Sequence, residues 1–340
     1  MEYQHREGDN SELVVASFGY FIGVSNRGIT LRRKGVQIPV PPSIVLKHIT
    51  ILSDGVSISS NAIAFCMVKN IPIDFFDSHS LHIASIVSPK FLQTTHWDMQ
   101  SRLSLEKRVL IAKKIIVGKL RNQLNLIKYF HKYHKTILDF DVQYTRIESS
   151  FKEVLMKLRI CPILEQYQES IMAQEAQGAL LYWEYVRLLI EDDDVGFEFR
   201  EHQGATDLVN SMLNYGYAIL YPRIWQAILR HRLNPYMGFI HYQDGNANLV
   251  FDIIELFRSQ AVDRVVISMI QKKERLVMKA GKLDDTTRSL LTKNIFERLN
   301  RYEKYRGVES RFADIINLQV TELTSCLTDN TTYRPYIAKW

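Results

Sequence analysis

The spacing of apolar and polar residues divides the chain into two parts of different texture. Up to about residue 95, β-branched and aromatic residues occur in short runs separated by turn residues such as Ser25-Asn26 and Lys34-Gly35, which is typical of strands. A single helix interrupts them, with Ser59 or Ser60 as its N-cap. We expect strands at 13–17, 20–24, 28–33, 48–52, 55–58, 71–76 and 81–87, and the helix at 61–69.

The pattern changes to helical after this point. Residues 98–135 contain no proline and only one glycine, Gly118. Their apolar positions follow helical spacing, as at Leu105, Val109, Ala112, Ile116 and Leu120. Helical patterns continue to about Thr328, with turn signals at 192–196, 202–205, 234–238 and 244–248. The pattern therefore predicts an α+β protein with a polar tail (1–10), a small β-rich domain (11–95) and a larger all-α domain (96–340).

Composition limits the class of protein. The chain has 340 residues and is 46% hydrophobic, which is ample for two packed domains. Its three cysteines are far apart and form no CxxC pair, which argues against a disulfide framework or a thiolate zinc site and fits a reducing cytoplasm. The polar N-terminus has no apolar signal-peptide core, and no apolar run reaches the length of a membrane span. We therefore expect a cytoplasmic protein with no membrane association.

The distribution of charge favours nucleic acid as a partner. The net charge of +6 is weak evidence by itself, but residues 1–95 are close to neutral, whereas residues 102–135 hold ten Lys or Arg and a single acid, Glu106. A concentrated basic segment fits a phosphate backbone better than a diffuse excess does. The lysines and arginines expected to contact phosphates are Lys113, Lys119, Arg121 and Lys128, although some of them will be ordinary solvated helix charges.

Two places in the helical part combine a functional side chain with unusual surroundings. Glu175 lies in a stretch of small residues, 171–179, where another backbone or a ligand can approach closely. Taken alone, a glutamate in such a helix is more often a surface residue. His241 closes an apolar run that follows Asn234-Pro235, and a lone histidine there is more often a hydrogen-bonded core residue than a metal ligand.

A third place carries a pair of acids. Asp252 and Glu255 are three residues apart and so share one helix face, beside apolar residues that should be buried. Buried carboxylates are costly unless something positive neutralises them. Arg258 could do so through a salt bridge, and a divalent metal could do so equally well. Carboxylates with one imidazole suit Mg²⁺ or Mn²⁺. The motifs of a P-loop, a dinucleotide fold and an α/β-hydrolase are absent.

Several stretches in order along the chain resemble the family of CRISPR-associated integrases of spacer acquisition. They cover most of the chain, from about Leu13 to Thr328. The stretches that carry the resemblance are 55–59 with 70–73, 112–123, 207–220, 238–241 and 252–258. Three features depart from the family pattern. Ala176 stands where a glycine usually follows the glutamate, the segment 201–206 lacks the usual prolines, and the acids at 191–194 are unusual.

The resemblance implies a set of roles. Glu175, His241 and Glu255 match the family's metal ligands, and Asp252 matches an adjoining acid needed for activity. The implied reaction inserts captured DNA fragments (spacers) into a CRISPR array by transesterification: a 3′-hydroxyl of the fragment attacks a phosphodiester of the repeat, with Mg²⁺ or Mn²⁺ as cofactor. Arg258, next to these acids, joins the basic residues expected to contact DNA.

The resemblance also implies the partners. They are double-stranded DNA, a second copy of the chain in a homodimer formed largely through the β domains, and a small ferredoxin-like companion protein that bridges two dimers. Two alternatives remain. One is a non-catalytic DNA-binding scaffold of the same fold, which the complete set of four site residues disfavours. The other is a related transposon-borne integrase, which the lack of an obvious extra C-terminal DNA-binding domain disfavours.

Overall fold

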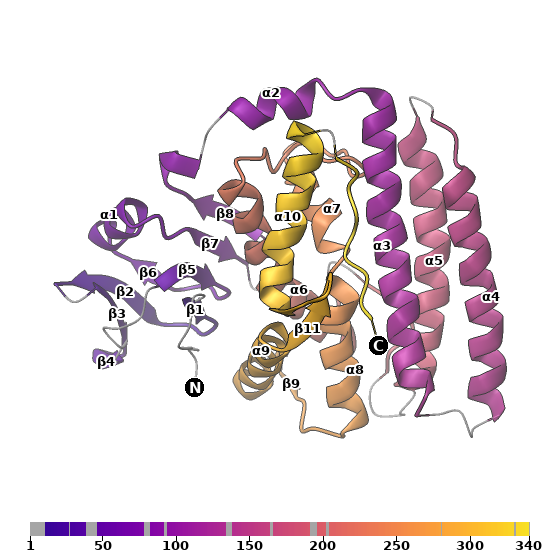
Figure 1. The fold of residues 1–340 in the computed structure, drawn as a ribbon. Helices are drawn as coiled ribbons and strands as arrows, with labels where there is room; N and C mark the ends of the chain where they lie inside the picture. The colour runs from indigo at the N-terminus through magenta and orange to yellow at the C-terminus, as the bar shows by residue number, and fades with distance from the viewer. Residues whose placement is uncertain are drawn as a thin grey trace.

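The computed structural model describes residues 11–26, 28–38, 46–77, 82–91, 94–133, 138–163, 166–190, 196–201, 204–279, 281–329 and 331–339. It shows a β-rich part followed by a mainly helical part (Figure 1). The predicted α+β class is confirmed. The predicted tail 1–10 and the acids at 191–194 lie outside the described residues.

The β-rich part consists of two four-stranded sheets. One has the order β1-β5-β7-β8 and the other β4-β3-β2-β6. In the first sheet β1, β5 and β7 are parallel, and β8 is antiparallel to β7. The elements are β1 (Ser11–Val15), β2 (Tyr20–Ser25), β3 (Gly28–Arg33), β4 (Val36–Ile38), β5 (Leu46–Ile51), β6 (Ser57–Ile58), α1 (Ser60–Val68), β7 (Ile73–Phe76) and β8 (His82–Ile86). The Ser59 side chain accepts a hydrogen bond from the backbone N–H of Ala62, which confirms Ser59 as the N-cap of α1.

Apolar residues of the first strands fill the core of this part. Val15, Tyr20 and Ile22 belong to this core and are at most 4% exposed, whereas Val14, 3% exposed, packs into the core of the helical part. By contrast, Phe18 is 70% exposed and Phe21 is 40% exposed. The short strand β4, which the sequence pattern did not predict, pairs with β3 across the turn at Lys34-Gly35, where both residues have positive φ. Most of the apolar strand residues therefore serve the core of the domain itself.

A buried carboxylate lies in the middle of the first sheet. Asp74 on β7 is 0% exposed, and its Oδ2 lies 2.6 Å from Nε2 of His48 on β5. Its Oδ1 lies 3.3 Å from Nε2 of His82 and accepts a hydrogen bond from the hydroxyl of Ser85, both on β8. Burial by itself would raise the pKa of Asp74, but the hydrogen bonds from His48 and His82 outweigh burial and lower the pKa to about 2.

Replacing Asp74 by asparagine is expected to lower the free energy of unfolding by about 3 kcal/mol, because a buried charge partner is lost. In the wild type, the depressed pKa of Asp74 contributes stability above the ordinary pKa of 3.8, and this contribution is lost as pH falls through about 2. Urea denaturation as a function of pH measures both effects. Asp54→Asn, an exposed change in the same domain, is the control. An equal acid dependence in Asp74→Asn and the wild type would contradict the prediction.

The helical part follows after a short connection. Its elements are η1 (Pro89–Phe91), α2 (Thr95–Ser101), α3 (Leu105–His131), α4 (Leu138–Ile160), α5 (Tyr167–Leu189), α6 (Leu208–Arg230), α7 (Asn248–Ile254), the π-helical turn η2 (Ser259–Asp263), α8 (Arg264–Gln271), β9 (Met278–Lys279), β10 (Lys282–Leu283), α9 (Asp285–Leu299), β11 (Tyr302–Tyr305), β12 (Val308–Arg311) and α10 (Phe312–Thr328). The helices α3, α4 and α5 pack against one another at one end of the molecule (Figure 1). No helix in the described part of the chain is long and apolar enough to cross a membrane.

The helix α6 lies at the centre of this part and also contacts the β-rich part. It is buried on nearly all faces. The His82 ring of β8 packs against Tyr221 and Trp225 of α6, with ring centroids 4.7 and 5.6 Å away. The end of the chain packs beside α3, where the Asn122 side chain donates to the carbonyl of Tyr336 at 3.0 Å and accepts from the N–H of Ala338 at 2.8 Å.

The prediction of an all-helical second part missed two features. The hairpins β9–β10 and β11–β12 lie within it. In addition, the helix predicted from residue 98 onward is interrupted before α3, because the side chain of Ser104 accepts from the N–H of Lys107 and caps a new helix. Both differences are local and leave the predicted order of a β-rich part and a helical part unchanged.

Candidate active site

Two glutamates and a lysine from three helices meet in the helical part. Lys119 extends from α3, Glu175 from α5, and Glu255 follows directly after α7. The Lys119 ammonium lies 2.5 Å from Oε1 of Glu175 and 2.6 Å from Oε2 of Glu255. All three side chains are at most 13% exposed. The two carboxylates therefore share one cation in a partly enclosed position.

Small residues allow the helices to approach this closely. A Cβ added at Gly178 of α5 would lie 2.4 Å from the Leu120 side chain of α3. A Cβ added at Gly118 would lie 2.5 Å from the Leu256 side chain. The expectation that the stretch around Glu175 admits a close neighbour is thus confirmed, and the neighbour is α3.

Neighbouring charges determine the direction in which the pKa values of Glu255 and Lys119 shift. Burial by itself would raise the pKa of Glu255, but Arg258 and Lys119 outweigh burial and hold the pKa at about 2. Arg258 also donates a hydrogen bond to Oε1 of Glu255. Burial would lower the pKa of Lys119, but the charges of Glu255 and Glu175 outweigh it and raise that pKa. The salt bridge to Arg258 considered from the sequence is present, and Lys119 is a second counter-ion that the sequence did not indicate.

Asp252 holds the loop that carries His241. The Asp252 carboxylate is 0% exposed and accepts hydrogen bonds from the backbone N–H groups of Phe239, Ile240 and His241, the last two at 3.1 Å. Its Oδ1 also lies 2.7 Å from Nδ1 of His241. A Cβ added at Gly238 would lie 2.9 Å from Oδ2 of Asp252, so the loop can close on the carboxylate only with glycine there.

This arrangement fixes the orientation of the His241 ring. Because a carboxylate accepts the hydrogen of Nδ1, Nε2 of His241 is the nitrogen that keeps its lone pair when the ring is neutral. Burial by itself would lower the pKa of His241, but the hydrogen bond and charge of Asp252, with Glu255 and Glu175, raise it. Metal-binding histidines usually donate their other ring nitrogen to a carboxylate in this way.

The four residues predicted as a site thus form two neighbouring pairs. Glu175 and Glu255 hold the Lys119 ammonium, and Asp252 orients His241. Within the described part of the chain, no three His, Cys, Asp or Glu side chains already converge as a set that could hold a metal ion. In this arrangement Asp252 has its oxygens occupied by protein donors, whereas Glu175 and Glu255 point at a cation.

The residues predicted to contact DNA fall into two groups. Arg121 and Lys128 are exposed, and Lys128 lies 2.8 Å from Glu148. Lys119 and Lys113 are only partly exposed, because Lys119 contacts the two glutamates and the Lys113 ammonium donates to the carbonyl of Cys161. Arg258 is only 21% exposed because it is turned inward towards Glu255. Helical spacing alone cannot distinguish these lysines, since neighbouring helices decide which face is covered.

A further network supports Arg258 and had no signal in the sequence pattern. The Arg258 guanidinium lies over the Tyr217 ring, 4.7 Å from its centroid. The hydroxyls of Tyr217 and Tyr182 donate to Asp263 at 2.6 and 2.8 Å. Asp263 ends the π-helical turn η2, which directly follows Arg258. The network joins three elements and holds Arg258 against Glu255.

Comparison with known proteins identifies the family. The family model described as CRISPR associated protein Cas1 matches residues 13–303 of the chain. The chain belongs to the Cas1 family. A CRISPR-associated endonuclease Cas1 of Archaeoglobus fulgidus is 27% identical over 354 residues, which cover 96% of this chain and 99% of the relative. The names of such relatives support the sequence prediction of a CRISPR-associated nuclease or integrase.

Two solved structures share the Cas1 fold seen here. A casposase bound to integration product has a TM-score of 0.79 and 21% identity, covering 95% of this chain and 92% of that one. A Cas6-RT-Cas1–Cas2 complex contains a chain with a TM-score of 0.83 and 17% identity, which matches 100% of this chain over 37% of its own length. The same fold therefore occurs in a casposase and within a longer chain of a Cas6-RT-Cas1–Cas2 complex.

Proposed function

We propose that this Cas1 protein is a metal-dependent DNA integrase that joins the 3′-hydroxyl of a captured DNA fragment to a CRISPR repeat by transesterification. The observation that carries the proposal is the convergence of Glu175 and Glu255, from two different helices, on one buried cation position, together with a His241 ring that Asp252 orients. Relatives named as Cas1 endonucleases, and a similar fold in a casposase bound to integration product, support it.

The donor set fits Mg²⁺ or Mn²⁺. Two carboxylates and one imidazole form an oxygen-rich set of the kind these ions prefer. The Lys119 ammonium shows that a positive charge is stable between the two glutamates. Glu175, Glu255 and Nε2 of His241 would hold the ion, and Asp252 would keep the ring in place. A bound divalent ion would polarise the phosphoryl oxygen and stabilise charge on the attacking and leaving oxygens.

The remaining residues have roles that follow from their contacts. Asp252 orients the His241 ring so that Nε2 is available when the ring is neutral. Arg258 restrains one oxygen of Glu255. Lys119 neutralises both glutamates in the metal-free protein and, if an ion displaced it, would supply a positive charge near them that could stabilise a phosphate.

A strand-transfer assay tests the proposed function. The protein is incubated with a duplex that carries a labelled 3′-hydroxyl end and a plasmid bearing the repeat, with Mg²⁺, Mn²⁺ or EDTA. Joined product is expected with either ion and absent with EDTA. If product formed equally in EDTA, metal dependence would be refuted. If DNA were bound but never joined or cut, the non-catalytic scaffold would be the better description.

Binding of double-stranded DNA is part of the proposal, and its electrostatic basis can be measured. Affinity for duplex DNA is expected to fall steeply with salt as counterions are released. Replacing the exposed Arg121 by glutamine should reduce the slope of log affinity against log salt by about 1. Arg32→Gln, an exposed change in the β-rich part, is the control. If the slope did not change in Arg121→Gln, Arg121 would not belong to the DNA interface.

Assembly is proposed on two grounds. The exposed rings of Phe18 and Phe21 in the β-rich part offer apolar surface for a homodimer. A structural neighbour is a Cas1–Cas2 assembly, which supports a Cas companion, proposed here as a small ferredoxin-like protein that bridges two dimers. Light scattering is expected to give about twice the 39.7 kDa of one chain. If the wild type has the mass of one chain at micromolar concentration, and Phe18→Asp has the same mass, the dimer is contradicted.

A further inference from the structure

The hydroxyl of Tyr167 ties helix α5 to the loop that carries His241. Tyr167 is the first residue of α5 and is 3% exposed. Its hydroxyl donates a hydrogen bond to the backbone carbonyl of Phe239 at 2.6 Å. Burial raises the pKa of Tyr167 to about 12, so the hydroxyl keeps its hydrogen and remains a donor at neutral pH. This contact connects two segments that lie 72 residues apart in the sequence.

The same peptide group is held from its other end by α7. The carbonyl of Phe239 and the N–H of Ile240 belong to one planar peptide group. The N–H of Ile240 donates to Oδ2 of Asp252 at 3.1 Å, while the carbonyl accepts from Tyr167. Phe239 and Ile240 are at most 2% exposed, so bulk water would not replace a lost partner. The peptide group directly before the one that leads to His241 is therefore fixed at both ends.

Tyr167 lies on the face of α5 that also carries Glu175. Residues that recur at intervals of three or four share one side of a helix. On α5 they are Tyr167, Ile171, Glu175, Gly178 and Tyr182. Eight residues separate Tyr167 from Glu175, which corresponds to about 12 Å along the helix axis. Because a continuous helix is stiff over this length, the Tyr167 hydrogen bond sets the position of the loop relative to Glu175.

The beginning of the loop has a separate restraint. Gln100 of α2 is 2% exposed. Its side chain accepts from the N–H of Asn234 at 2.6 Å and donates to the carbonyl of Asn234 at 3.2 Å. Neither hydrogen bond involves Tyr167. Loss of the Tyr167 hydroxyl should therefore loosen the loop near His241 and leave its beginning in place.

We infer that Tyr167 is a positioning residue of the proposed active site, whose hydroxyl keeps the His241 loop at a fixed position relative to Glu175. The inference rests on the proposed function, in which Glu175 and His241 bind the same divalent ion. These two side chains come from separate elements, so their separation depends on contacts between the elements. The hydrogen bond from Tyr167 to Phe239 is such a contact, and it acts without touching the ion.

Tyr167→Phe tests this role because it removes one hydroxyl and keeps the ring. Hydrogen–deuterium exchange of the full chain in EDTA, followed by mass spectrometry, measures the loop directly. Exchange at residues 239–241 is expected to become about tenfold faster than in the wild type, since the Phe239 carbonyl loses its partner. Exchange at residues 234–236 should not change. If residues 239–241 exchanged at the wild-type rate, Tyr167 would not hold the loop and the inference would be overturned.

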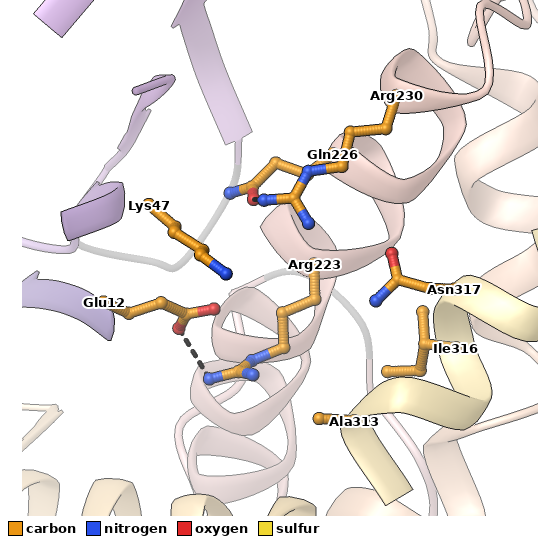
Figure 2. A pocket seen from close by; sticks show the side chains of 8 residues that line it. All are labelled: Glu12, Lys47, Arg223, Gln226, Arg230, Ala313, Ile316 and Asn317. Carbon is orange, nitrogen blue, oxygen red and sulfur yellow. Dashed lines mark hydrogen bonds and ion pairs between the residues drawn. The ribbon is translucent and has the colours of Figure 1, made fainter. Parts of the chain in front are cut away.

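Two controls separate this effect from a general loss of stability. Tyr185→Phe removes another buried hydroxyl from the same helix, one that lies 3.1 Å from Nδ1 of His131. Glu12→Gln removes a mostly buried charge that pairs with Arg223 at 2.5 Å, where β1 meets α6 (Figure 2). Both variants are expected to unfold at a lower urea concentration than the wild type, with unchanged exchange at residues 239–241. If either control accelerated that exchange as much as Tyr167→Phe, the loop would report only global stability and the inference would be overturned.

The second measurement is the affinity for Mn²⁺, by calorimetry and by the Mn²⁺ dependence of strand transfer. The dissociation constant and the Mn²⁺ concentration that gives half the maximal rate are both expected to rise about tenfold in Tyr167→Phe, because residues that orient metal ligands change affinity by such factors. The KM for DNA and the rate at saturating Mn²⁺ should change by less than about twofold, since the buried Tyr167 touches neither DNA nor the ion. Tyr185→Phe should give the wild-type values.

The outcomes separate the inference from the proposed function. If the wild type binds Mn²⁺ and Tyr167→Phe binds it with the same affinity, the inference is overturned and the proposed function stands. If the wild type neither binds Mn²⁺ nor transfers strands, the proposed function fails and the inference fails with it. Faster exchange at residues 239–241 together with weaker Mn²⁺ binding, in Tyr167→Phe and in neither control, supports both.

Discussion

Replacing His241 by alanine is expected to reduce strand transfer by more than about 100-fold, because it removes the one nitrogen donor of the proposed metal site. Asp252→Asn should reduce it by about 10-fold to 100-fold, since the amide NH2 cannot accept and so leaves either Nδ1 of His241 or the loop N–H groups without an acceptor. Both rates are measured in the strand-transfer assay at saturating Mn²⁺, and the affinity for Mn²⁺ is measured separately by calorimetry.

Controls separate chemistry from folding in this experiment. Asp244 is exposed in the same segment as His241 and has no part in the site, so Asp244→Asn should retain the wild-type rate. Circular dichroism establishes whether each variant is folded, because Asp252 accepts three backbone N–H groups and its replacement also strains the loop. If a folded His241→Ala protein transferred strands at the wild-type rate, His241 would not belong to the site and the proposed ligand set would be wrong.

The second large effect is expected from Lys119→Met. In the metal-free protein this change leaves Glu175 and Glu255 without the ammonium that both contact, and the free energy of unfolding should fall by about 3 kcal/mol. Mn²⁺ should then stabilise Lys119→Met more than it stabilises the wild type, because no ammonium has to leave the position between the two carboxylates. Urea denaturation in EDTA and in Mn²⁺ measures both quantities.

Lys114→Met is the matched control for this variant. It makes the same substitution on the same helix at an exposed position and should leave both the stability and the effect of Mn²⁺ unchanged. If Mn²⁺ stabilised Lys119→Met no more than the wild type, Lys119 and the ion would not share a position. In that case the two glutamates would serve the lysine as a structural ion pair, and the proposed metal site would lose its main support.

Local chemistry accounts for the features that the sequence predicted well. The turn at Lys34-Gly35 and the cap at Ser59 are decided by a few adjacent residues, because a positive φ or an unpaired N–H is satisfied within one turn of chain. Strands and helices follow from the alternation of apolar residues, which is also local. The hairpins β9–β10 and β11–β12 were missed because strands of two to four residues are too short to establish a period.

What the sequence determined by itself was the order of a β-rich and a helical part, and it predicted the side chains now proposed for the chemistry: Glu175, His241, Asp252 and Glu255. Only the tertiary structure decided which groups each of these side chains contacts, and therefore which role it has. Asp252 and Glu255 look equivalent along one helix, yet Asp252 is enclosed by backbone N–H groups and His241, whereas Glu255 meets Lys119 and Arg258. The contacts of Lys119 with the two glutamates could not be predicted either, since its position in the helical pattern is that of an exposed cation. The physical reason is that a charge takes its role from the groups packed around it, and those groups come from helices far apart in the sequence.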